Sequence, residues 1–243
     1  MTKKTIAIIM AMQQEAEPVI KALNLKEYKA PEWSVFSNNM AIKIYKSSVY
    51  LVLNGMCKKN NVDRVGTQAA AISAFMCAEL IKPDLIISLG TAGAASTHGF
   101  NIGDVVIGKE IFLYHDRRIP LPKFDQYGLG LFPVYKKSAE IAKRLKLKQA
   151  KIATGNSLIN TSEDLQVLKD HEACVKEMEV ASIAEVALNY NIPVLAVKGI
   201  TDFYDCPEQS AEQFAHNFNL VNNNLSEAIG KVIETYNLIE EAI

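Results

Sequence analysis

Short runs of almost uninterrupted apolar residues recur along this chain, for example IAIIM at 6–10, LIISL at 85–89 and VLAV at 194–197. A strand with one wet face alternates apolar and polar residues, so continuous apolarity indicates strands that are covered on both faces. That is typical of the parallel or mixed sheet of an α/β fold. The runs predict strands at Thr5–Met12, Ala41–Lys46, Tyr50–Asn54, Leu85–Leu89, Asp104–Phe112, Lys151–Ala153, Ala173–Met178 and Val194–Ile200.

Helical patterns fill the gaps between these runs. They predict helices at Glu15–Leu23, Asn61–Ile81, Lys136–Leu145, Val180–Asn189 and Ser210–Ala242. The last one opens with Ser210-Ala-Glu-Gln213, a capping-box pattern in which both side chains bind free backbone N–H groups of the first turn. The alternation of strands and helices therefore supports the α/β class.

Composition limits the kinds of partner. The chain has 243 residues, 49% apolar types and a formal net charge of −1. We expect a single domain over residues 1–243. The balanced charge provides no basic surface for nucleic acid or for a membrane, and no apolar run approaches the ~18–20 residues of a membrane span. Acidic and amide residues follow the first apolar run, so we expect a buried strand rather than a signal peptide, and a cytoplasmic protein.

Polar and acidic residues gather where the predicted strands end, which is where α/β proteins bind ligands. The strand ends carry Met12-Gln-Gln-Glu15, Gly90-Thr-Ala-Gly93, Thr154–Ile159, Glu177-Met-Glu179 and Thr201-Asp202. Asp202 is either a helix cap or a rigidly aimed general acid. Glu15 is either a first-turn acid favoured by the helix dipole or a site residue.

Two further features of these strand ends leave alternatives open. Glu177 and Glu179 share one face of an extended chain, and the pattern does not decide which of them faces a ligand or solvent. Gly90 and Gly93 indicate either a close approach of the backbone to a ligand or a tight turn.

Motifs for other chemistries are absent from the sequence. It contains no GxGxxG, GxxxxGK[ST], HExxH or GxSxG, which disfavours dinucleotide, nucleotide-phosphate, zinc-protease and α/β-hydrolase sites. Its cysteines, at positions 57, 77, 174 and 206, form no CxxC pair, and its histidines lack metal spacing. We therefore expect neither a metal nor an organic cofactor.

Taken in order, the segments IAIIMAMQQEAEPV, IISLGTAGAA, NIGDVV, TGNSL, KEMEVASIAEVA and VKGITD resemble the 5′-methylthioadenosine/S-adenosylhomocysteine nucleosidases of the nucleoside phosphorylase superfamily. They extend from residue 6 to about residue 220, and 115–131 resembles the plant-type branch. The resemblance implies a three-layer αβα sandwich with a central mixed β-sheet, and a homodimer. It also implies hydrolysis of the N-glycosidic bond of methylthioadenosine, with S-adenosylhomocysteine as a further candidate substrate, to adenine and a 5-thioribose.

The same resemblance implies roles for individual residues. Asp202 protonates adenine N7 as the general acid, and Glu15 activates the water. Glu179 binds the ribose hydroxyls beside Met178, and the backbone of Ile159 reads the adenine edge. The other implied substrate-binding residues are Met12 at the alkylthio pocket, Thr91 near the reaction centre, Leu158 at the base and Thr201 beside the acid.

Two alternatives remain. A phosphate-dependent purine nucleoside phosphorylase shares the fold but needs cations at the open face of the sugar, where Lys198 is an isolated candidate. A carboxylate at Glu15 would repel phosphate in the water position by about 4 kcal/mol at ~4 Å and an effective dielectric near 20, which favours water. A non-catalytic adenosine-type binding protein has one point of support, because Asn156 stands where the family usually has Asp.

The segment HDRRIPLPKFDQYGLGLFPVY at 115–135 is the longest stretch without a predicted element. A loop of this length within a compact domain is usually functional or disordered. Its apolar and aromatic residues favour an ordered excursion. We expect it to contact a second subunit or to cover the site.

Overall fold

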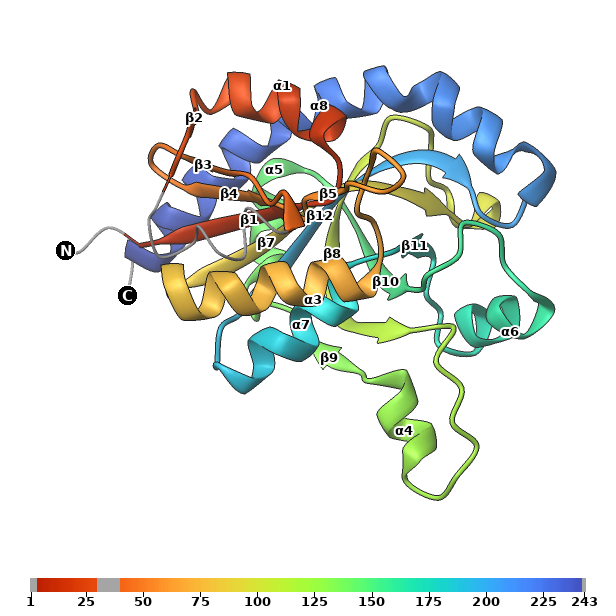
Figure 1. Ribbon diagram of the computed structural model, residues 1–243. Helices are drawn as coiled ribbons and strands as arrows, with labels where there is room; N and C mark the ends of the chain where they lie inside the picture. The colour runs from red at the N-terminus through yellow and green to blue at the C-terminus, as the bar shows by residue number, and fades with distance from the viewer. Residues whose placement is uncertain (1–3, 30–39, 242–243) are drawn as a thin grey trace.

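The computed structural model describes residues 4–29 and 40–241, with the side chains of 207–209 left out. Its centre is a ten-stranded mixed sheet (Figure 1). The main path runs β11-β10-β8-β12-β7-β1-β4-β3-β2, and β9 pairs with β8. The predicted α/β class and mixed sheet are therefore confirmed.

Strand bounds follow the apolar runs, with the longest strands extending beyond them. The strands are β1 (Ile6–Met10), β2 (Lys26–Glu27), β3 (Ile44–Lys46), β4 (Tyr50–Leu53), β7 (Leu85–Ala94), β8 (Val105–Tyr114), β9 (Phe132–Pro133), β10 (Lys148–Thr154), β11 (Val175–Glu177) and β12 (Val194–Phe203). A separate hairpin pairs β5 (Met56–Cys57) with β6 (Val62–Asp63). Because β7 and β12 are longer than predicted, Gly90–Gly93 and Thr201-Asp202 lie within strands.

Helices cover both faces of the sheet (Figure 1). They are α1 (Gln13–Ala22), α3 (Thr67–Met76, continued by a π-helical turn, Cys77–Ile81), α4 (Phe124–Leu129), α5 (Ser138–Leu145), α6 (Ser162–Asp170), α7 (Val180–Asn189) and α8 (Pro207–Glu241). The predicted start at Asn61 is wrong, because β6 and Gly66, with φ of 93°, precede α3. None of the described helices, the 35-residue α8 included, combines the length and apolarity that a membrane crossing requires.

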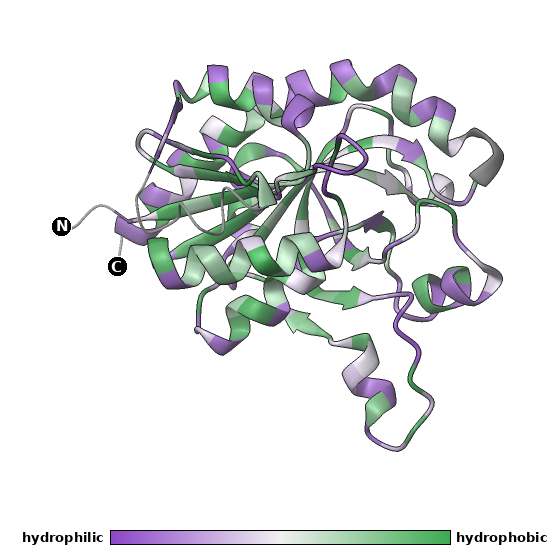
Figure 2. Ribbon diagram, in the orientation of Figure 1, coloured by the Kyte–Doolittle hydropathy of each residue, from purple (hydrophilic) through white to green (hydrophobic). Residues whose placement is uncertain are grey.

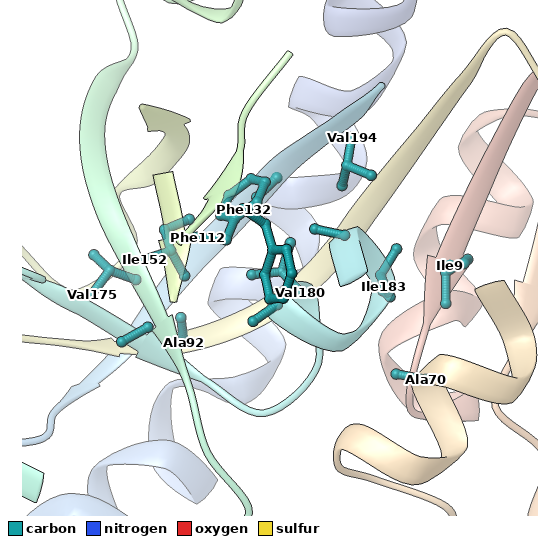
Figure 3. Packing of buried hydrophobic residues seen from close by; sticks show 14 of the residues in the cluster. Ile9, Ala70, Ala92, Phe112, Phe132, Ile152, Val175, Val180, Ile183 and Val194 are labelled. Carbon is teal, nitrogen blue, oxygen red and sulfur yellow. The ribbon is translucent and has the colours of Figure 1, made fainter. Parts of the chain in front are cut away.

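Two hydrophobic clusters explain the continuous apolarity of the strands. Neighbouring residues of β1 point to opposite sides: Ile9 packs in one cluster with residues of α3 and α7, and Ile8 packs in the other with α1 and α8. Figure 2 shows the central strands as mostly hydrophobic, and Figure 3 shows Phe112, Phe132 and Val180 gathered in the first cluster. The strands are thus buried on both faces, as their sequences predicted.

Part of the sheet closes on itself. Strand β11 pairs with β10 on one side and antiparallel with β7 on the other, so β7, β12, β8, β10 and β11 form a closed ring. Register shifts between Ile200 and Asp202 in β12, and between Ala150 and Ile152 in β10, mark irregular positions in it. Bulges of this kind bend strands and increase their twist. The sheet is therefore an open twisted layer at its β1–β4 side and barrel-like at the other.

The segment 115–135 is an ordered excursion that leaves the body of the molecule and carries α4 (Figure 1). Arg117 attaches its base to α7, because Nη1 donates to Glu185 Oε2 at 2.8 Å. The guanidinium also lies 4.1 Å from the centre of the Tyr114 ring and 5.0 Å from that of Tyr127. Leu121, Phe124 and Tyr127 are more than half exposed on it.

Candidate active site

A cavity of about 340 Å³ lies where the strand ends meet, and nearly all of the predicted site residues line it. Those in its wall are Met12, Glu15, Thr91, Leu158, Met178, Glu179, Thr201 and Asp202. Ile159 is outside the wall and 62% exposed, and its carbonyl oxygen accepts a hydrogen bond from Ser157 Oγ at 2.7 Å. Residues that are far apart in the sequence are thus brought to one cavity.

Glu15 is buried in the first turn of α1, directly after β1. Thr91 binds it twice: the backbone N–H donates to Oε1 at 3.1 Å and the hydroxyl at 2.6 Å. Its other oxygen, Oε2, lies over Gly90, since a Cβ at that position would be 3.5 Å from it. Glu15 is therefore a fixed carboxylate in the cavity wall, as well as a first-turn acid.

Asp202 is buried in β12 at the register shift, which brings it and Thr201 to the same cavity. Thr201 Oγ1 donates to Oδ1 at 2.8 Å, and the hydroxyl of Ser210 donates to Oδ2. The helix-cap interpretation of Asp202 is wrong, because α8 begins only at Pro207. The capping box at Ser210 is wrong as well: Ser210 lies inside the helix and holds Asp202, and Gln213 Oε1 accepts from the Phe203 N–H.

The structure separates the roles of Glu177 and Glu179, which the sequence left open. Glu177 is buried, pairs with Lys198 Nζ at 2.9 Å, and accepts from the backbone N–H groups of Glu179 and Val180 at the start of α7. Glu179 is only partly buried, and its Oε1 accepts from the Gly66 N–H at 2.8 Å. Burial, with the nearby charge of Glu177, raises the pKa of Glu179 to about 7. Both residues line the cavity, but Glu177 is a structural anion paired with a lysine, and Glu179 is held by a backbone amide.

Gly90 and Gly93 leave room for these carboxylates. Neither has a positive φ, so the tight-turn interpretation does not hold. A Cβ at position 93 would lie 2.9 Å from Asp202 Oδ2. Because Gly90 and Gly93 lack a Cβ, the side chains of Glu15 and Asp202 can pack closely against β7.

The cations of the cavity are already engaged. Within the described part of the chain its lining includes Lys176 and Lys198 and no arginine. Lys198 pairs with Glu177 and donates to Ser88 Oγ at 3.0 Å. Lys176 donates to the carbonyl oxygens of Ser157 and Leu158 at 2.6 and 2.9 Å, and burial lowers its pKa to about 8. Because both lysines already have partners, neither indicates a binding site for phosphate.

Sequence reasoning missed Lys176, Ser210 and Phe214, all of which lie at or beside the cavity. Alternation along the predicted strand Ala173–Met178 places Lys176 on the face of Met178, which was an available signal for it. No local signal identified Ser210 or Phe214, because both lie on a helix that reaches the cavity only through the fold. In the described ranges no group of three or more His, Cys, Asp or Glu side chains is arranged to hold a metal ion.

Comparisons with known proteins identify the family of the chain. The family model described as the Phosphorylase superfamily matches residues 5–234. The 5′-methylthioadenosine/S-adenosylhomocysteine nucleosidase of Arabidopsis thaliana is 35% identical over 237 residues, covering 95% of this chain and 91% of the relative. A 5′-methylthioadenosine nucleosidase of the same plant is 33% identical, covering 96% and 87%.

Solved structures give the same assignment. The Arabidopsis thaliana 5′-methylthioadenosine nucleosidase in apo form superimposes with a TM-score of 0.90 and 32% identity, covering 97% of this chain and 96% of that one. Fold and sequence thus lead to one family. The chain belongs to the phosphorylase superfamily and, within it, to the 5′-methylthioadenosine/S-adenosylhomocysteine nucleosidases.

Proposed function

We propose that this protein hydrolyses the N-glycosidic bond of 5′-methylthioadenosine, and of S-adenosylhomocysteine as a further substrate, to adenine and a 5-thioribose. The observation that carries the proposal is the pair of buried carboxylates, Glu15 and Asp202, in the wall of one cavity. Each is held by neutral hydroxyl or amide donors rather than by a cation. Both side chains are thus fixed and remain available for proton transfer.

Asp202 acts as the general acid on the base. Breaking the bond leaves an electron-rich purine, which departs readily only after N7 takes a proton. Thr201 and Ser210 fix the direction of the carboxyl group. A positioned acid of this kind contributes a factor of ~10²–10⁴ to the rate.

Glu15 acts on the sugar side. Its Oε1 is held by Thr91, so Oε2 orients and deprotonates the attacking water. The negative charge also stabilises the oxocarbenium-like sugar. Met12 flanks the alkylthio group in this arrangement, and the partly buried carboxylate of Glu179 accepts hydrogen bonds from two ribose hydroxyls beside Met178.

The base lies against Leu158, and the backbone of Ile159 reads its edge. The exposed position of Ile159 is compatible with this role, because the role uses backbone groups rather than the side chain. Lys176 holds the carbonyl oxygens of Ser157 and Leu158 and so fixes the preceding peptide groups.

Hydrolysis is favoured over phosphorolysis by the state of the lysines. Lys198, the earlier candidate for phosphate binding, is 2% exposed and paired with Glu177. The test is adenine release from methylthioadenosine in phosphate-free buffer and in phosphate. Equal rates are expected. Turnover only with phosphate would establish the phosphorylase, and binding without any release would establish the adenosine-type binding protein.

We also propose that the chain is one domain with a three-layer αβα arrangement. It works in the cytoplasm and needs no metal or organic cofactor. It forms a homodimer through the segment 115–135. The dimer is supported by the exposed apolar side chains of Leu121, Phe124 and Tyr127 on a segment that leaves the body of the molecule. Light scattering at micromolar concentration tests it, and a monomer would exclude this role for the segment.

A further inference from the structure

Asn156 joins two segments of the cavity wall that are far apart in the sequence. Its backbone N–H donates to Asp116 Oδ2 at 2.7 Å, which fixes it at the end of β10. Its side-chain Oδ1 accepts from the Thr67 N–H at 2.9 Å and from Thr67 Oγ1 at 3.0 Å. Thr67 is the first residue of α3, so Asn156 supplies a helix cap from outside the helix.

The residue just before this capped turn contacts Glu179. The N–H of Gly66, the residue before Thr67, donates to Glu179 Oε1 at 2.8 Å. Gly66 has a φ of 93°, and a Cβ there would lie 2.8 Å from Asn156 Oδ1. The close approach of the two segments therefore depends on glycine at 66 and on the amide at 156.

We propose that Asn156 is a positioning residue, which holds the Gly66 N–H against Glu179 and so couples the base-side loop to the recognition of the ribose hydroxyls. This inference rests on the proposed function, in which Glu179 binds those hydroxyls. Asn156 itself does not line the cavity, although Ser157 and Leu158, which follow it, do.

The charges around Glu179 make this contact important. Glu177 from β11 and Glu15 from α1 oppose its ionisation, and Lys198 from β12 and the Gly66 N–H favour it. The ionised carboxylate of Glu179 offers acceptors on both oxygens to the two hydroxyls, whereas protonation turns one of these oxygens into a donor. Losing the Gly66 donor therefore reduces the ionised fraction at neutral pH, in addition to freeing the side chain. A neutral amide at 156 provides the acceptor without adding a carboxylate beside Asp116.

The test compares Asn156→Ala and Asn156→Asp on methylthioadenosine and on its analogue without the 2′- and 3′-hydroxyls. Asn156→Ala should lower kcat/KM for methylthioadenosine about tenfold at pH 7, since hydrogen bonds to charged groups are among the stronger ones. The loss should shrink as the pH rises, and the dideoxy analogue should lose less than about twofold. Asn156→Asp keeps the acceptor oxygen and should recover most of the efficiency at pH 9.

Asn189→Ala is the matched control, because Asn189 is exposed at the end of α7 and lies outside the cavity wall; it should change neither substrate. Equal losses on both substrates, or no loss in Asn156→Ala, would overturn the inference. A wild-type protein that releases no adenine from methylthioadenosine would instead refute the proposed function. The two failures are therefore distinguishable.

Discussion

Replacing Glu179 by glutamine should stabilise the fold at high pH while weakening the recognition of the sugar. Burial and the charge of Glu177 raise the pKa of Glu179 from 4.5 to about 7. Above pH 7 the folded protein therefore carries a carboxylate that is more costly to ionise than in the unfolded chain. Each pKa unit corresponds to about 1.36 kcal/mol, which gives about 3 kcal/mol as an upper bound. Because Glu179 is only partly buried, we expect a gain of about 2 kcal/mol.

The sign of the effect fixes the pH range. Below pH 4.5 Glu179 is protonated in both states, so Glu179→Gln and wild type should differ little in their free energies of unfolding. The stability of wild type should fall relative to the variant as the pH rises from about 4.5 to about 7, and the difference should then stay level. Urea unfolding at pH 4.5 and at pH 8.5 measures the difference.

A matched control lies two residues away on the same segment. Glu177 is buried and paired with Lys198, so Glu177→Gln should destabilise the protein at both pH values. A constant difference between Glu179→Gln and wild type across this pH range would refute the reasoning, as would a stabilising Glu177→Gln.

Further predictions concern the site and the assembly. Asp202→Asn should retain nucleoside binding, measured by calorimetry, and lose adenine release by roughly 10²-fold or more; Glu15→Gln should do the same, and an unchanged kcat would exclude it as the water activator. Lys198→Met should cost about 3–5 kcal/mol in urea unfolding, because it leaves Glu177 charged and buried; a near-neutral effect would contradict the buried pair. Incubation with EDTA should leave adenine release unchanged, and a loss restored by added divalent metal would refute a metal-free reaction.

The fold was predictable where local pattern and burial coincide. Helix α7 has the predicted bounds, Val180–Asn189, because its apolar residues recur at helical spacing and pack against the sheet. Helix α6 (Ser162–Asp170) escaped prediction, although Thr161 and Asp164 form a true capping box there. Its third position is Asp instead of the usual Glu or Gln, and its surface is mostly polar. Capping patterns therefore failed as predictors in two places. The real box at Thr161 was not predicted, and the one predicted at Ser210 is a side-chain contact with Asp202.

The sequence could predict which strand ends carry the site residues, but not how these residues are arranged around the cavity. Pattern alone placed Glu15, Glu179 and Asp202 at strand ends, and the resemblance assigned their roles. The closed ring and the register shift at Thr201 depend on pairings between distant segments, such as β11 with β7, which no local window contains. For the same reason the sequence could not divide the work between Glu177 and Glu179.

The electrostatics of the cavity follow from how each charge is partnered. Of the four acidic residues that line it, Glu177 is paired with Lys198, whereas Glu15, Glu179 and Asp202 accept from hydroxyl or amide groups, which hold a carboxylate without cancelling its charge. The two lysines of the cavity have other partners: Lys198 pairs with Glu177, and Lys176 donates to backbone carbonyl oxygens. The cavity therefore keeps an excess of negative charge in a partly dehydrated space, where charges interact strongly. Such a field stabilises a cationic sugar and opposes the approach of phosphate, and both effects favour hydrolysis of a nucleoside over its phosphorolysis.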